Sequence, residues 1–188
     1  MSAKNNKGSE SYPSGYLTQE EIKQIISSIN DMRDRLLVRV LYESGCTLID
    51  LVNIKVSDKG GNTIKLSKED FKLRFARISG KLAKDLSLYI QGNSLQKDSY
   101  LFSARQGTSI SEKRVRQLIQ NYTEKAGLGR INPLSFRYSH IANAYLHGVF
   151  IESIALQLGL TTYRIFQVIS ELGIKPKANC YNEFLTRI

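Results

Sequence analysis

The chain shows two periodicities, and the strand-like one is confined to a single stretch. From Thr18 onward, apolar residues recur at helical spacing, as in Ile22, Ile25 and Ile26. Between Lys55 and Ile78 the pattern changes to alternating polar and apolar residues, which is typical of half-buried strands. Helical spacing then resumes and continues to about residue 172. This order predicts a mainly α-helical domain with a small antiparallel β-sheet, an α+β fold.

Capping and turn residues give the predicted bounds of the elements. Thr18-Gln19-Glu20-Glu21 is a capping box, Gly45 ends the second helix, and Ser79 and Ser111 are N-caps. The predicted helices begin at Thr18 and then cover 31–44, 79–90, 111–127, 135–147, 151–158 and 161–172, with a short turn at 48–51 and strands at 63–66 and 73–78.

A length of 188 residues suits one compact domain. Residues 1–16 are rich in Ser, Gly, Asn and Lys, so we expect a flexible polar tail before a domain at 17–188. Within that domain, residues 174–188 are expected to form a C-terminal tail or helix. An amphipathic pattern over Asn179–Ile188 suits a subunit contact in a homo-oligomer, or closure of the chain's own core.

Positive charge is concentrated in one block of the sequence. The formal net charge is +10, and residues 61–130 alone carry fourteen Lys and Arg against six Asp and Glu. A concentrated block of cations favours a binding face for a polyanion, whereas a merely solvated surface mixes the two signs. We therefore expect DNA as the partner.

Other classes of protein find little support in the composition. No stretch approaches the roughly 20 apolar residues that span a bilayer, and the polar start lacks the apolar run of a secretory signal. Cys46 and Cys180 have no metal-like spacing, and reduced intracellular thiols are expected. We therefore expect a cytoplasmic, DNA-associated protein without a metal, a cofactor, a membrane or a small-molecule substrate.

Three motifs resemble the boxes of a known family. Residues 41–51 read Leu-Tyr-Glu-Ser-Gly-Cys-Thr-Leu-Ile-Asp-Leu, similar to the box Leu-Tyr-x-Thr-Gly-Leu-Arg-Ile-Ser-Glu-Leu of tyrosine recombinases and phage-type integrases. Residues 133–139 resemble Pro-His-x-Leu-Arg-His-Ser/Thr, and residues 158–160 resemble Leu-Gly-His. The resemblance covers about residues 17–172 and implies the fold of the tyrosine-recombinase catalytic domain.

The resemblance also implies a reaction centre from which most of the chemistry is missing. In the family a tyrosine attacks a DNA phosphate, two Arg and a His stabilise the developing charge, and a Lys protonates the leaving oxygen. Here Thr47 stands at the first Arg position and is expected to act as a helix cap. Leu134 and Leu160 stand at the His positions, and Ile169 lies on or beside the tyrosine position. Core packing is the expected role of both leucines.

Arg137 is the one retained member of these boxes. An arginine within an apolar helix needs a partner, which is either an internal carboxylate or a DNA phosphate. Lys68 lies in the turn where the family keeps its general-acid Lys, although Lys-rich hairpins are also common solvated edges. Further candidate DNA-binding residues are Lys65, Lys72, Arg74, Arg105, Lys113, Arg114, Arg116, Arg130, Tyr163 and Arg164.

Three functions remain open from the sequence. The first is a non-catalytic DNA-binding protein derived from a recombinase catalytic domain, a pseudoenzyme that binds duplex DNA largely through its phosphates. The second is an atypical active integrase that uses a displaced tyrosine, such as Tyr163, Tyr181 or Tyr138. The third is a protein-interaction module that modulates a recombinase.

Overall fold

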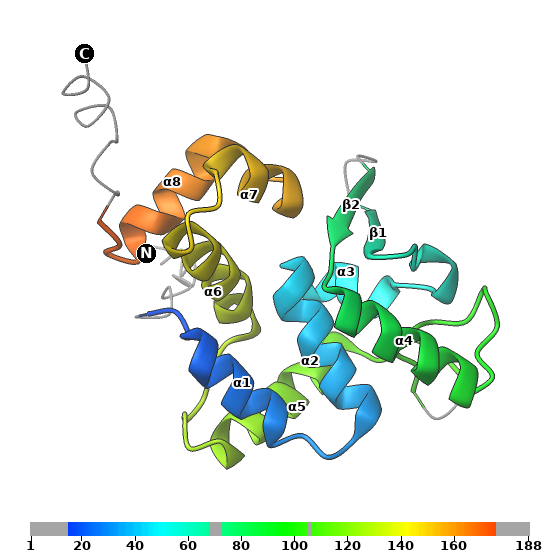
Figure 1. The fold of residues 1–188 in the computed structure, drawn as a ribbon. Helices are drawn as coiled ribbons and strands as arrows, with labels where there is room; N and C mark the ends of the chain where they lie inside the picture. Colours follow the sequence, from blue (N-terminus) through cyan, green and yellow to red (C-terminus); the bar gives the residue numbers. More distant parts are fainter. Residues whose placement is uncertain (1–14, 68–72, 105–106, 176–188) are drawn as a thin grey trace, which may run out of the picture.

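The structure is a computed structural model that describes residues 15–67, 73–104 and 107–175. Its fold is mainly helical, and one β-hairpin is inserted after the third helix (Figure 1). The helices are α1 (Gln19–Ser27), α2 (Met32–Ser44), α3 (Leu48–Asn53), α4 (Gly80–Gly92), α5 (Glu112–Lys125), α6 (Pro133–Leu146), α7 (Ile151–Leu158) and α8 (Thr162–Glu171), with a 3-10 turn η1 (Val56–Asp58). The strands are β1 (Thr63–Ser67) and β2 (Leu73–Arg77).

Side-chain caps begin most helices where the sequence predicts them. The Thr18 hydroxyl accepts from the amide of Glu21 at 3.2 Å, and the Glu21 carboxylate accepts from the amide of Thr18 at 2.7 Å. Ser79 and Ser111 cap α4 and α5 in the predicted places. The start of α6 differs from the prediction by two residues. Asn132 caps that helix and a proline occupies its first position, where the missing N–H has no cost.

The predicted hairpin is confirmed as a two-stranded antiparallel sheet. Ile64 pairs with Ala76, and Lys65 pairs with Phe75. Ile64, Leu66 and Ala76 are buried on the inner face, while Phe75 is exposed on the other. This alternation follows the two-residue period of strands, which places successive side chains on opposite faces.

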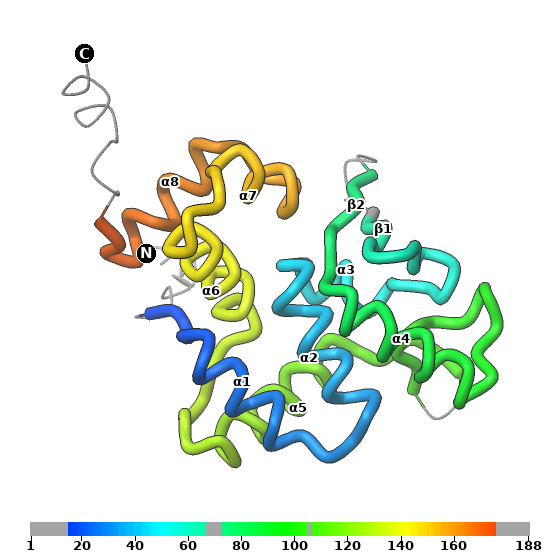
Figure 2. Tube along the Cα trace, viewed as in Figure 1, coloured from blue at the N-terminus to red at the C-terminus, as the bar shows by residue number. Residues whose placement is uncertain are grey.

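Two apolar clusters stabilise the fold. The larger cluster unites α1 to α5 and the hairpin around residues such as Leu37, Leu51 and Ile119. The smaller cluster lies between α6, α7 and α8 and includes Ile141 and Ile165. Figure 2 shows α6, α7 and α8 grouped on one side of the molecule, with α2, α3, α4 and the hairpin on the other.

Helix α6 belongs to both clusters. Phe136 near its start is buried in the larger cluster, and Ile141 is buried in the smaller one. The segment before α1 also lies against α6, because the amide of Leu17 donates to the Ser139 hydroxyl at 2.7 Å and the Asn143 side chain donates to the carbonyl of Leu17 at 3.0 Å. The predicted amphipathic segment Asn179–Ile188 lies outside the described residues.

Candidate functional site

The position that the resemblance assigns to the first catalytic arginine is a helix cap. The Thr47 hydroxyl accepts from the amide of Asp50 at 3.1 Å, and the Asp50 carboxylate accepts from the amide of Thr47 at 3.1 Å. This reciprocal pair is a capping box at the start of α3. The expected capping role of Thr47 is therefore confirmed, and its short neutral side chain brings no positive charge to the centre.

The other positions that the resemblance assigns to catalytic residues are occupied by packed apolar side chains. Leu134 and Leu160 are partly buried against the cluster of α6, α7 and α8, as expected. Ile169 on α8 is only 2% exposed. An aliphatic side chain can neither donate a proton nor attack a phosphate, so these three positions contribute packing and no chemistry.

Arg137 on α6 lies at the centre of the site and is 8% exposed. Its guanidinium donates through Nη1 to the carbonyl of Gly45 and through Nη2 to the carbonyl of Leu158, the latter at 3.0 Å. Gly45 and Leu158 stand at the carboxyl ends of α2 and α7, where helix carbonyls lack intrahelical donors. The internal partner is therefore a pair of carbonyls and not a carboxylate, and the other alternative, a DNA phosphate, stays a prediction.

Arg74 on β2 reaches the same place from the opposite direction. Its Nη1 donates to the carbonyl of Gln157 at 2.6 Å, and its Nη2 forms an ion pair with the Asp50 carboxylate at 3.4 Å. Both side chains of the pair are 10% exposed. Burial is the main cause that lowers the pKa of Arg137 to about 10, and the positive charge of Arg74 acts in the same direction. The two guanidinium groups are thus electrostatic neighbours.

His140 is a member of this region that no sequence motif singled out. It lies three residues after Arg137, hence on the same side of α6. Its Nδ1 lies 2.9 Å from the carbonyl of Tyr42, which can only accept, so Nδ1 carries the proton and Nε2 does not. Burial is the main cause that lowers the pKa of His140 to about 4, and the positive charges of Arg137 and Arg74 lower it further.

His140 also lines a hollow of about 390 Å³ between β2, α6 and α7. Phe75, Val149 and Leu156 contribute exposed apolar side chains to its walls. Gln157 borders the same hollow, and its side-chain amide bonds to β2 and to the end of α2. No sequence signal distinguished Gln157, because its partners lie up to 114 residues away in the chain.

The remaining predicted DNA-binding residues are distributed over several surfaces. Lys113 and Arg114 are exposed at the start of α5, while Lys65 on β1 is partly exposed. Tyr163, 70% exposed, lies at the start of α8 beside Arg164. Helix α5 packs on α1 and α3, whereas α8 packs on α6 and α7. The structure therefore brings Arg74 and Arg137 together but places the α5 and α8 candidates on separate helices.

Three of the predicted cations have carboxylate partners on the surface. Arg116 pairs with Glu112 at 2.9 Å, Arg130 pairs with Glu124 at 3.3 Å, and Arg164 pairs with Glu171 at 3.4 Å. Such exposed pairs are weak, about 0–1 kcal/mol each, so a competing phosphate can replace the carboxylate at little cost. Four residues named from the sequence lie outside the described part of the chain: Lys68, Lys72, Arg105 and Tyr181.

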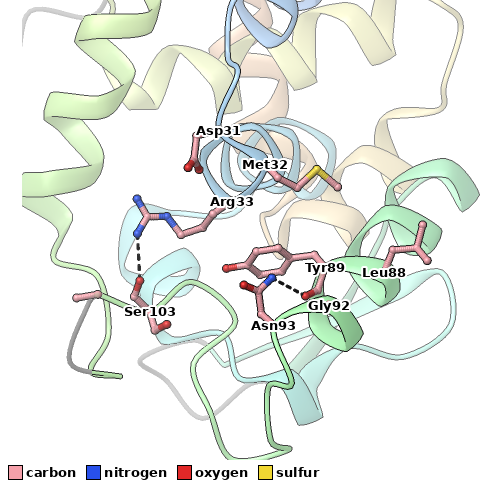
Figure 3. A pocket seen from close by; sticks show the side chains of 9 residues that line it. Asp31, Met32, Arg33, Leu88, Tyr89, Gly92, Asn93 and Ser103 are labelled. Atoms are coloured by element: carbon pink, nitrogen blue, oxygen red, sulfur yellow. Dashed lines mark hydrogen bonds between the residues drawn. The ribbon is translucent and has the colours of Figure 1, made fainter.

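A second hollow, of about 590 Å³, lies between the start of α2, the end of α4 and Ser103 (Figure 3). Arg33 donates to the carbonyl of Ser103 at 3.2 Å and pairs with Asp34 at 2.7 Å. The guanidinium is thus already bonded within the protein. This hollow lies at the amino-terminal end of α2, whereas Gly45 lies at the carboxyl end. None of its lining residues belongs to the arginine centre, which is formed by Arg74, Arg137 and their hydrogen-bond partners.

Comparison with known proteins places the chain in a family. The model of the phage integrase family matches residues 15–168, and the chain belongs to that family. Tyrosine recombinase XerA of Pyrococcus horikoshii is 29% identical over 180 residues, which cover 92% of this chain and 61% of that protein. This chain thus spans about three fifths of that relative's length.

Solved structures share the fold. The crystal structure of XerA recombinase superposes with a TM-score of 0.75 at 22% identity, covering 92% of this chain and 65% of that one. The XerH site-specific recombinase bound to palindromic difH substrate, a post-cleavage complex, gives a TM-score of 0.74 at 17% identity, covering 88% of this chain and 52% of that one. The architecture is that of a tyrosine-recombinase catalytic domain, as the sequence predicts.

Within the described ranges, no helix combines the length and apolarity needed to cross a bilayer. The same ranges hold no group of three or more His, Cys, Asp or Glu side chains placed to bind a metal ion. The chemistry that the described centre offers is the binding of an anion by guanidinium groups.

Proposed function

We propose that this chain binds duplex DNA on an integrase fold, largely through phosphate contacts, and forms no covalent link to it. One observation carries the proposal. The centre holds two guanidinium groups, Arg74 and Arg137, which donate to the consecutive carbonyls of Gln157 and Leu158, while the position expected for the nucleophile holds the buried Ile169. Cations without a nucleophile support binding of a phosphate but not its attack.

The state of a phenol beside His140 supports the same function. Burial is the main cause that raises the pKa of Tyr42, which lies beside His140. A raised pKa disfavours the phenolate, so Tyr42 is not activated for nucleophilic attack.

The charge distribution supports a phosphate-based interaction. The net charge is +10, and Lys113 and Arg114 expose cations near α3, against which α5 packs. Each phosphate neutralised by a cation releases counterions, so log affinity should fall with log salt by about 0.9 per contact. The lambda integrase, a protein with the same fold, has a crystal structure bound to DNA, which makes DNA the ligand class to test.

A mobility-shift series on a short duplex at several salt concentrations tests the proposal. We expect binding that weakens as the salt concentration rises. In the Lys113→Ala/Arg114→Ala double variant, the slope of log affinity against log salt should be smaller in magnitude by roughly 1.8, which corresponds to the loss of two phosphate contacts. The matched control is Lys23→Ala on α1, which removes an exposed cation outside the predicted interface and should bind like the unaltered protein. A binding constant independent of salt would reject the proposal.

An active recombinase is the second candidate, because the chain belongs to a family whose relatives are named tyrosine recombinases. Such an enzyme would use a displaced tyrosine, for example Tyr163, which is 70% exposed at the start of α8. A nicked suicide duplex followed by denaturing electrophoresis decides between the two. A covalent adduct that disappears in Tyr163→Phe or Tyr181→Phe would establish the enzyme and overturn the non-catalytic function.

A further inference from the structure

The carboxyl end of α7 is held against β2 by an amide side chain. Gln157 donates from Nε2 to the carbonyl of Arg77 at 2.8 Å, and its Oε1 accepts from the amide of Arg77 at 2.9 Å. The same Nε2 lies 3.3 Å from the carbonyl of Glu43, near the end of α2. One side chain thus occupies both backbone groups of Arg77, as a neighbouring strand would.

Both guanidinium groups bind the same helix end. Arg74 donates to the carbonyl of Gln157, and Arg137 donates to the carbonyl of Leu158. Gly159, which follows, lies so close to Arg74 that a Cβ there would meet its Cδ at 2.8 Å. Figure 1 shows α7 and β2 facing each other in the upper part of the molecule, with α6 below α7. The side chain of Arg137 from α6 and that of Arg74 from β2 therefore converge on the carboxyl end of α7.

The charges of the described residues at this point do not balance. Within that part of the chain, two guanidinium groups face one carboxylate, Asp50, and the other acceptors are the carbonyls of Gly45, Gln157 and Leu158. Carbonyl groups at helix ends carry only partial negative charge. A cation that is nine-tenths buried and paired with partial charges retains a strong preference for a full anion.

We propose that Arg74, Arg137 and Gln157 form a phosphate-responsive clamp on α7. In the closed state described here, the arginines bind helix-end carbonyls. A DNA phosphate that takes over the guanidinium groups displaces these carbonyls and releases α7 from β2. The inference rests on the proposed DNA binding and adds its regulation.

A DNA phosphate must compete with the acceptors that the guanidinium groups of Arg74 and Arg137 already bind. The Nη1 and Nη2 atoms of both arginines already hold acceptors, and little of either side chain reaches solvent. A bidentate phosphate contact uses two of the three guanidinium nitrogen atoms and therefore at least one of Nη1 and Nη2. Because α7 supplies an acceptor to each arginine, loss of both bonds loosens a single helix. Helix α8 packs on α7 and would loosen with it.

The linkage between the clamp and DNA gives Gln157 a distinctive role. Its amide is uncharged and stabilises the closed state without meeting the phosphate. Removing it therefore weakens only the state that competes with DNA, and the reciprocal nature of linkage requires tighter DNA binding. If Gln157 had only a structural role, its removal would leave the affinity for DNA unchanged or would lower it.

Hydrogen–deuterium exchange of the unaltered protein, with and without a saturating short duplex, is the first test. We expect faster exchange of the amides in residues 151–160 when DNA is bound, although bound ligands ordinarily slow exchange. Unchanged or slower exchange there, in a sample shown by mobility shift to be fully bound, would overturn the clamp alone. Absence of any complex would instead remove the proposed function and the clamp together.

The second test measures DNA affinity of Gln157→Ala at constant salt. Loss of the amide contacts should raise affinity roughly three- to tenfold, because each hydrogen bond contributes modestly to the closed state. The matched control is Gln91→Ala, at an exposed position on α4, which should bind unchanged. Equal or weaker binding by folded Gln157→Ala contradicts the clamp. If that variant fails to fold, the exchange experiment still decides the matter.

Discussion

Arg74 and Arg137 bring two positive charges into a region with little access to water. Burying a charge is costly unless partners replace the lost hydration, and one carboxylate cannot neutralise two guanidinium groups. The closed arrangement offsets part of this cost with carbonyls from the ends of α2 and α7. The position of each arginine therefore depends on backbone that the other elements supply.

A substitution at Gly159 tests how closely the side chain of Arg74 packs against the end of α7. Its φ of +64° disfavours a side chain, and a Cβ would also meet the Cδ of Arg74 at 2.8 Å. Gly159→Ala should lower the free energy of unfolding by about 2–3 kcal/mol, the backbone cost plus the displacement of Arg74. Gly127→Ala is the control, since φ is +73° but nothing lies within 4 Å. Urea unfolding measures both, and equal losses would refute close packing at Arg74.

His140 makes a pH-dependent contribution of known sign. Its pKa falls from 6.5 to about 4 on folding, so between these values the unfolded chain binds a proton that the folded protein does not. The free energy of unfolding should therefore decrease as pH falls from about 6.5 towards 4. Urea titrations across this range, compared with His140→Gln, measure the effect. A variant with the same pH slope as the unaltered protein would exclude His140 as its source.

At the scale of elements, α3 is short and depends on its cap. Six residues provide few internal hydrogen bonds, so the reciprocal bonds of Thr47 and Asp50 matter for its start. Asp50 also pairs with Arg74, which links this helix to β2. At position 47, where the resemblance implies an arginine, Thr47 thus orders the local backbone.

Thr47→Ala should destabilise the protein by about 1 kcal/mol, because the amide of Asp50 loses its acceptor. Thr47→Ser keeps the hydroxyl and is the control, with stability expected near that of the unaltered chain. Thermal or urea unfolding followed by circular dichroism gives both values. Similar losses in the two variants would point to the methyl group and not to the cap.

At the scale of the molecule, two apolar clusters share one helix. The cluster of α6, α7 and α8 is the smaller, and the arginine centre lies where it meets the larger one. Regions with less buried apolar contact open at lower free energy than the main core. The fold therefore has a natural boundary at the site of the proposed clamp.

Native-state hydrogen exchange of two core variants measures this difference. Ile165→Ala should reduce protection mainly in α7 and α8, because its contacts lie within the smaller cluster. Leu37→Ala should reduce protection throughout the protein, since it weakens the core that opens only on global unfolding. The same pattern of lost protection in both variants would show that the molecule opens as one unit.

Much of the fold was predictable from the sequence, because helix starts and periodicity are local. Thr18, Ser79 and Ser111 cap their helices where predicted, and the alternating stretch forms the hairpin. The family boxes indicated the integrase fold. Packing of Leu134 and Leu160 followed from their apolar character.

Tertiary structure alone decided the partners of the arginines and the roles of Gln157 and His140. Arg137 meets Gly45 from 92 residues away, and Gln157 meets Arg77 from 80 residues away. These contacts join backbone groups at the ends of α2, α7 and β2, and a carbonyl is present at every residue whatever its side chain. No pattern of residue types marks which carbonyl a distant guanidinium will reach, because the convergence of separate elements determines it.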